Sequence, residues 1–211
     1  MSNTNHTFHP TAIVAVNEAL VVLGQDVLLD ELSQTSESVN SRKAAYLYES
    51  ARKRVLGDHN WNFATTDIPA DSCQCGCDSA MPYVTQKPTR CVCVIGCFSN
   101  NQLCNYCITG KEIRSDLPID RISYIQDVED LDRWTADAYR ALVLRLAADL
   151  AKPITGRINE RQLQEEAYAD QISNAKLADA KESNIPYDAW GENYYVNQMR
   201  GGVLPKPDWR R

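Results

Sequence analysis

The chain has 211 residues, a net charge of −6, 44% apolar residues and 24% charged residues. This length fits one domain with an appended tail, and the apolar content excludes wholesale disorder. Sequence-independent affinity for nucleic acid comes from surplus Lys and Arg, which this acidic chain lacks. The first residues do not form a signal peptide, and no apolar run approaches the roughly 20 residues that span a bilayer. We therefore expect a soluble protein made in a cytosol.

Two helices are predicted in the first third of the chain. A helix over about 12–23 follows from apolar residues at helical spacing, and Gly24 lies where a C-terminal glycine belongs. A second helix is predicted over about 38–56, with Arg52, Lys53 and Arg54 complementing the negative end of its dipole. Trp61 and Phe63 follow directly, and aromatic residues at such a place are expected to fold back onto the core.

The middle of the chain, about 67–127, has a different period. Short β-branched runs alternate with turn residues, and Asn100-Asn101 and Thr109-Gly110-Lys111 are typical hairpin turns. This pattern predicts a small antiparallel sheet inserted between helices. The acidic string Gln126–Asp132 lacks the glycine and the ligand spacing of a calcium loop, so we expect a solvated turn before the next helix.

Helical periodicity returns after this insertion. Thr135 is the expected N-cap of a helix over about 135–152, which Pro153 and Gly156 end. A fourth helix is predicted over about 159–181, with Asn159–Gln162 close to a capping box. The fold expected from this order is mainly α, a four-helix-type bundle with a small inserted antiparallel β element (α+β), in one domain over 1–182.

The last stretch, 183–211, combines proline and glycine with several aromatic residues, in which disordered linkers are usually poor. It is therefore interpreted as an extended C-terminal docking segment that lies on a partner. The residues expected to make that contact are Trp190, Tyr194, Tyr195 and Trp209.

All eight cysteines lie between Cys73 and Cys107. Three interpretations stay open: packing as small hydrophobic residues, a zinc site, or disulfides. Cys91 and Cys93 stand two apart and are expected on one face of a strand. The candidate zinc ligands are Cys73, Cys75, Cys77, Cys104 and Cys107, of which only the last two have the usual knuckle spacing.

Catalytic constellations are absent from the sequence. There is no nucleophile elbow, no phosphate-binding glycine loop and no His-Glu-x-x-His motif. A cysteine hydrolase would pair a thiol with His59, but a hydrogen bond at the preceding helix end is the expected role of that histidine. We expect neither an enzyme nor a cofactor.

Several segments in a fixed order resemble a known family. They are Val16-Asn17 with Leu20 and Leu23-Gly24, Trp61-Asn-Phe-Ala64, Thr109-Gly-Lys-Glu-Ile113, Ile122-Ser-Tyr-Ile125, Leu144-Arg-Leu-Ala-Ala-Asp-Leu-Ala-Lys-Pro-Ile-Thr-Gly156, and a last helix with Tyr168, Ala175 and Ala180. Over about 12–182 the chain resembles the tail tubular protein A, or head-to-tail adaptor, of short-tailed bacteriophages.

The resemblance implies a non-enzymatic virion protein, assembled in the host cytoplasm as a ring in the neck of the tail, typically of twelve copies. Such a ring lies between the portal protein and a tail nozzle (a tail tubular protein B-like partner), and genomic DNA passes through it without sequence-specific binding. The eight cysteines depart from the family pattern. The alternative function is a zinc-stabilised binding module built on that cysteine cluster.

Overall fold

The computed structural model describes residues 10–26, 28–75 and 80–182. About 47% of the described residues are helical and 22% are in strands. The described residues form four α-helices, eight strands and one 3₁₀ helix: α1 Pro10–Val22, α2 Val39–Gly57, β1 Thr65–Pro69, β2 Cys73–Gln74, β3 Tyr83–Gln86, β4 Cys91–Ser99, β5 Gln102–Leu103, β6 Tyr106–Thr109, β7 Glu112–Ser115, β8 Arg121–Gln126, η1 Leu131–Arg133, α3 Ala136–Thr155 and α4 Ile158–Glu182.

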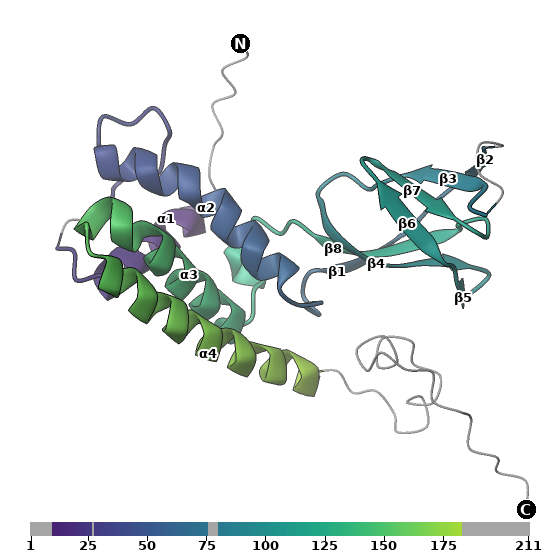
Figure 1. Ribbon diagram of the computed structural model, residues 1–211. Helices are drawn as coiled ribbons and strands as arrows, with labels where there is room; N and C mark the ends of the chain where they lie inside the picture. Colours follow the sequence, from purple (N-terminus) through teal and green to yellow (C-terminus); the bar gives the residue numbers. More distant parts are fainter. Residues whose placement is uncertain (1–9, 27, 76–79, 183–211) are drawn as a thin grey trace, which may run out of the picture.

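The expectation of a mainly α, four-helix-type bundle is wrong. The described chain is α+β, with two four-stranded antiparallel sheets ordered β1-β8-β4-β5 and β2-β3-β7-β6. The helices lie together on one side and the strands form a second body beside them (Figure 1). The strand region is more than a small insertion because it encloses a hydrophobic core of its own.

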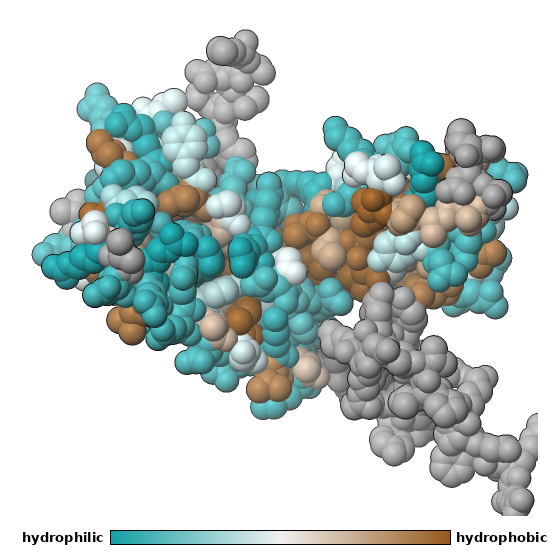
Figure 2. Space-filling model, viewed as in Figure 1, coloured by the Kyte–Doolittle hydropathy of each residue, from teal (hydrophilic) through white to brown (hydrophobic). Residues whose placement is uncertain are grey.

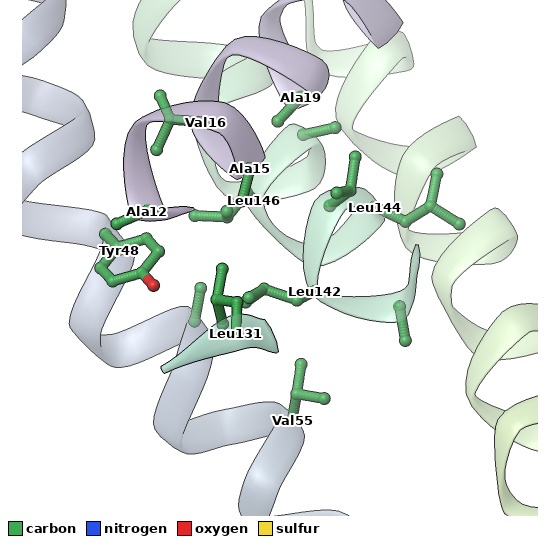
Figure 3. Close-up of a cluster of buried hydrophobic side chains, with 14 of the residues drawn as sticks. Ala12, Ala15, Val16, Ala19, Tyr48, Val55, Leu131, Leu142, Leu144 and Leu146 are labelled. Carbon is green, nitrogen blue, oxygen red and sulfur yellow. The ribbon is translucent and has the colours of Figure 1, made fainter. Parts of the chain in front are cut away.

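Helix α3 is the common partner of the other three helices, each of which packs against it. Its buried stripe includes Leu142, Leu146 and Leu150, all fully enclosed. Figure 3 shows side chains of α1, α2 and α3 gathered around one centre, with Tyr48 and Leu131 among them. Burying each leucine of this kind contributes about 1.5–3 kcal/mol.

The two faces of the β1-β8-β4-β5 sheet pack against different cores. Ile95 and Ile125 belong to the helical core, whereas Val94, Ile122 and Tyr124 belong to a second core shared with the other sheet. Alternate residues of a strand point to opposite faces, so one pair of strands serves both cores. This double use joins the helices to the strand body.

The helix boundaries lie close to the predicted ones, and the predicted N-cap at Thr135 is present. Ser38 and Thr135 accept hydrogen bonds from the backbone N–H groups of Ser41 and Ala138. Two details differ. Pro153 lies inside the last turn of α3, which ends at Gly156 with a φ of 70°. Helix α4 begins at Ile158, so the expected capping box does not precede it.

Both predicted hairpin turns are present. Asn100 and Asn101 have φ angles of 48° and 63° between β4 and β5. Gly110, with a φ of 64°, lies between β6 and β7. Asparagine and glycine are the residues that tolerate this left-handed conformation at least cost.

Candidate assembly surfaces

The described zinc candidates do not come together. In residues 10–26, 28–75 and 80–182, no three His, Cys, Asp or Glu side chains are placed to hold one metal ion. Cys73 on β2 and Cys107 on β6 are exposed at opposite edges of one sheet, and Cys104 is buried in the second core. Cys75 is half-buried beside β2. Cys77 lies outside the described residues.

The cysteines of β4 do not share one environment. A register shift between Cys91 and Cys93 breaks the simple alternation of the strand. Cys91 packs partly against the second core, and Cys93 is exposed. The expected shared face is therefore wrong, because the prediction assumed a regular strand.

Two cysteines behave as small core residues. Cys97 and Cys104 are 0% and 1% exposed, and the N–H of Cys104 donates to the carbonyl of Cys97 at 2.9 Å. Burial raises the pKa of the Cys97 thiol to about 12 and also raises the pKa of Cys104. A thiol that stays protonated is a poor nucleophile and a poor metal ligand.

The sequence suggested that His59 forms a hydrogen bond at the end of the preceding helix, α2. Its side chain instead contacts α4. Its Nε2 lies 3.2 Å from Oδ2 of Asp179, on the last turns of α4. Asp179 is only 2% exposed and also accepts the backbone N–H of Asn62 at 3.1 Å. Sequence reasoning missed this carboxylate, although its place at helical spacing after Ile172 and Ala175 indicates an inward-facing position.

The acidic string before α3 is not simply solvated. Asp127 is buried and accepts two hydrogen bonds from the guanidinium of Arg52, each 3.0 Å long. Burial alone lowers the pKa of Arg52, but the hydrogen bonds and charge of Asp127 raise it above its ordinary value. Arg52 therefore pairs with Asp127, directly after β8, and does not stabilise the negative end of the α2 dipole as predicted. Only the folded arrangement brings these two residues together, 75 positions apart.

The Trp61-Asn-Phe-Ala64 segment locks helices and strands together. Trp61 is fully buried and donates its indole N–H to the carbonyl of Val55 at 2.8 Å. The Asn62 amide donates to the backbone carbonyl of Asp179 at 2.8 Å. Phe63 lies between Trp61 and Trp134, with ring centroids 5.7 and 5.3 Å away. The predicted return of these aromatic residues to the core is confirmed.

Exposed apolar side chains occur on two separate helices. Val14 and Val21 of α1 are 54% and 60% exposed, and Leu163 and Leu177 of α4 are 57% and 63% exposed. Both helices pack on α3. Brown patches interrupt the hydrophilic surface of the helical side in Figure 2. These side chains are candidates for contacts with other molecules because solvation of isolated large apolar groups is unfavourable.

An open depression of about 720 Å³ lies beside Leu177. Its walls are the end of α2 with the following turn, and the outer face of α4. The lining residues are Gly57, Asp58, His59, Asn60, Ser173, Lys176, Leu177 and Ala180. A smaller depression of about 310 Å³ lies at the far end of α3, near Leu23 and Glu160. Neither depression contains a cysteine.

No known family model matches the chain, and no curated protein matches it. None of the described helices is long and apolar enough to cross a bilayer. The aromatic residues predicted to dock on a partner, Trp190, Tyr194, Tyr195 and Trp209, lie outside the described residues.

Proposed function

We propose that this protein is a virion structural protein, a head-to-tail adaptor whose copies form a ring between a portal and a tail nozzle. The observation that carries the proposal is the ordered set of segments that resembles tail tubular protein A, above all Trp61–Ala64 and Leu144–Gly156. The proposal does not require a four-helix bundle. It concerns a subunit with helices on one side and a two-sheet body on the other.

The residues that carry the resemblance have architectural surroundings. Asn17 accepts the N–H of Leu29 at 2.8 Å and donates to its carbonyl at 2.9 Å, which holds the loop after α1. Trp61 fills the core, and Lys43 of α2 donates to the carbonyl of Pro153 at the end of α3 at 2.7 Å. Contacts of this kind position helices and support an architectural function.

A ring needs head-to-tail contacts between two different faces of each subunit. The exposed valines of α1 and the exposed leucines of α4 provide two such faces, because α3 packs against both helices. We propose that the α1 face of the next copy docks in the depression beside Leu177. A net charge of −6 suits a ring through which DNA passes, because the chain has no surplus of Lys and Arg to hold phosphates.

The first experiment is native mass spectrometry of the full chain, alone and with the portal protein of the same virion. A ring, or a stoichiometric complex with the portal, is the expected result. Leu177→Asp and Val14→Asp are each expected to abolish the ring. Leu117→Asp is the matched control, because Leu117 is also exposed, at 38%, but lies in the strand body.

Removal of residues 183–211 tests the docking segment separately. We expect loss of portal binding with the fold retained, as measured by circular dichroism. A monomer that ignores the portal contradicts the adaptor function. If that monomer also carries about one equivalent of zinc, the alternative binding module is favoured.

A further inference from the structure

Strand β6 is an open edge of its sheet. It pairs with β7 alone among the described strands, at the end of the order β2-β3-β7-β6. The chain changes sheet just before β6. The N–H of Cys104 donates to the carbonyl of Cys97 on β4, and after Asn105 the chain pairs with β7. Beyond this point, β4 pairs with β8 on one side, and on the other side the Tyr106 hydroxyl donates to the carbonyl of Val94 at 3.3 Å.

Among the described residues, the edge lacks two of the usual protections against strand pairing, a charged side chain and a proline. Its sequence, Tyr-Cys-Ile-Thr, contains neither a charge nor a proline, and Ile108 is 46% exposed. Thr109 and Glu112 flank a two-residue turn, so the alternation of an antiparallel pair directs the N–H and C=O of Ile108 away from β7. Figure 2 shows apolar surface along this part of the strand body.

The two ends of β6 differ in charge, because Glu112 beside Thr109 is paired with Arg114 at 3.4 Å and two lysines remain at that end. At the Thr109 end, Lys111 accepts the N–H of Lys87 through its carbonyl at 2.8 Å, and neither ammonium forms an ion pair with a described residue. At the Tyr106 end, Asp116 accepts the N–H of Asn105 at 3.0 Å. An incoming strand that begins with a carboxylate is therefore attracted in the antiparallel direction and repelled in the parallel one.

One segment of this chain has that chemistry. Glu192 is followed by Asn-Tyr-Tyr-Val196, an uncharged run whose last three residues favour strands. It begins ten positions after Glu182, the last residue of α4. At about 3.3 Å per residue, the intervening chain reaches roughly 30 Å.

We propose that residues 193–196 add to β6 of the same chain as an antiparallel strand, with Glu192 beside Lys87 and Lys111. Backbone hydrogen bonds at Ile108 supply the affinity, and the lysines set the direction. The proposal is independent of ring formation. Portal binding by the same tail requires its release from β6, so a portal is expected to compete with this contact.

The test is amide hydrogen exchange of the full chain, read at Ile108 by NMR. Tyr195→Pro removes a strand N–H from the tail, and Gly201→Pro is the matched control beyond the proposed strand. We expect Ile108 to exchange about tenfold faster or more in Tyr195→Pro than in the native chain, and unchanged in Gly201→Pro. Equal exchange of Ile108 in the native chain and Tyr195→Pro overturns the proposal.

Charge reversal tests the direction. Glu192→Lys is expected to speed the exchange of Ile108, and adding Lys111→Glu with Lys87→Glu is expected to slow it again. Failure of the triple variant to restore protection contradicts the antiparallel register. Protection that falls on dilution of the native chain shows that the strand comes from a second copy, which overturns pairing within one chain. None of these results depends on a portal or a ring, so this proposal and the adaptor function fail separately.

Discussion

Arg52 and Asp127 form a buried, two-pronged ion pair that ties the middle of α2 to the segment leaving β8. Nε and Nη2 of Arg52 each lie 3.0 Å from a carboxylate oxygen, and the two residues are 2% and 8% exposed. The ring of Tyr48 lies 5.6 Å from the guanidinium carbon. The pair stands where the helices meet the strands, so its loss affects the junction of the two bodies.

Removal of one partner of this pair is expected to be costly. Asp127→Ala leaves the Arg52 guanidinium buried without its acceptor, and we expect the free energy of unfolding to fall by about 3–5 kcal/mol. Urea denaturation measures it. The double variant Arg52→Met, Asp127→Leu is expected to recover most of the loss, since no charge is then left buried. Asp132→Ala, on the exposed 3₁₀ helix, is the control; a loss as large there would contradict the assignment.

Trp61 is expected to be the most sensitive core position in the turn between α2 and β1. Trp61→Ala opens a cavity and removes the hydrogen bond to Val55, which together lower stability by about 3–5 kcal/mol. Trp61→Phe keeps much of the volume and is expected to cost less. Tyr46→Ala is the control because Tyr46 is 65% exposed. Thermal unfolding followed by circular dichroism ranks the three variants.

Asp179 is expected to anchor the end of α4. Asp179→Ala removes the acceptor of the Asn62 N–H and of His59, with a loss of about 1–3 kcal/mol. Hydrogen exchange in residues 172–182 is expected to quicken more than exchange in α3. Asp170→Ala, exposed on the same helix, should leave both unchanged. Uniform quickening over the whole chain would instead indicate a global role for Asp179.

The cysteines are expected to divide into reactive and protected groups. In the folded protein at mild pH, iodoacetamide should label Cys73, Cys93 and Cys107 first, because these are exposed. Cys97 and Cys104 should react only on unfolding, since burial raises both thiol pKa values. Peptide mass spectrometry reads the order. Protection of Cys73 and Cys107 that a chelator abolishes would contradict it and favour zinc.

The same pKa shift has a consequence for stability at high pH. Cys97 titrates at about 12 in the folded chain, against an ordinary value of 9.0. The contribution of this thiol to the free energy of unfolding is complete below pH 9.0. It is lost as the pH rises towards about 12, because the thiol ionises at lower pH in the unfolded chain than in the folded chain. Cys97→Ala should flatten the decline of stability over this window, measured by urea denaturation at a series of pH values. An unchanged slope would contradict the shift.

Local patterns in the sequence determined the helices, two of their caps and both hairpin turns. Caps and turns act through backbone geometry within a few residues, so they can be predicted without a tertiary structure. Ser38, Thr135, Gly24 and Gly110 are of this kind. The return of Trp61 to the core was legible for a similar reason, since a large apolar side chain beside a helix end has few other places to go.

Tertiary structure alone decided the rest. The pairing of Arg52 with Asp127 and of Asp179 with His59 joins residues 75 and 120 positions apart, and no local spacing encodes such partners. The size of the strand body also depended on long-range pairing: β1 bonds β8, and β4 gives one face to each of two cores. The cysteines were separated for the same reason. Strand order places Cys73 and Cys107 at opposite sheet edges, and order within a sheet arises from packing between distant segments rather than from the strands themselves.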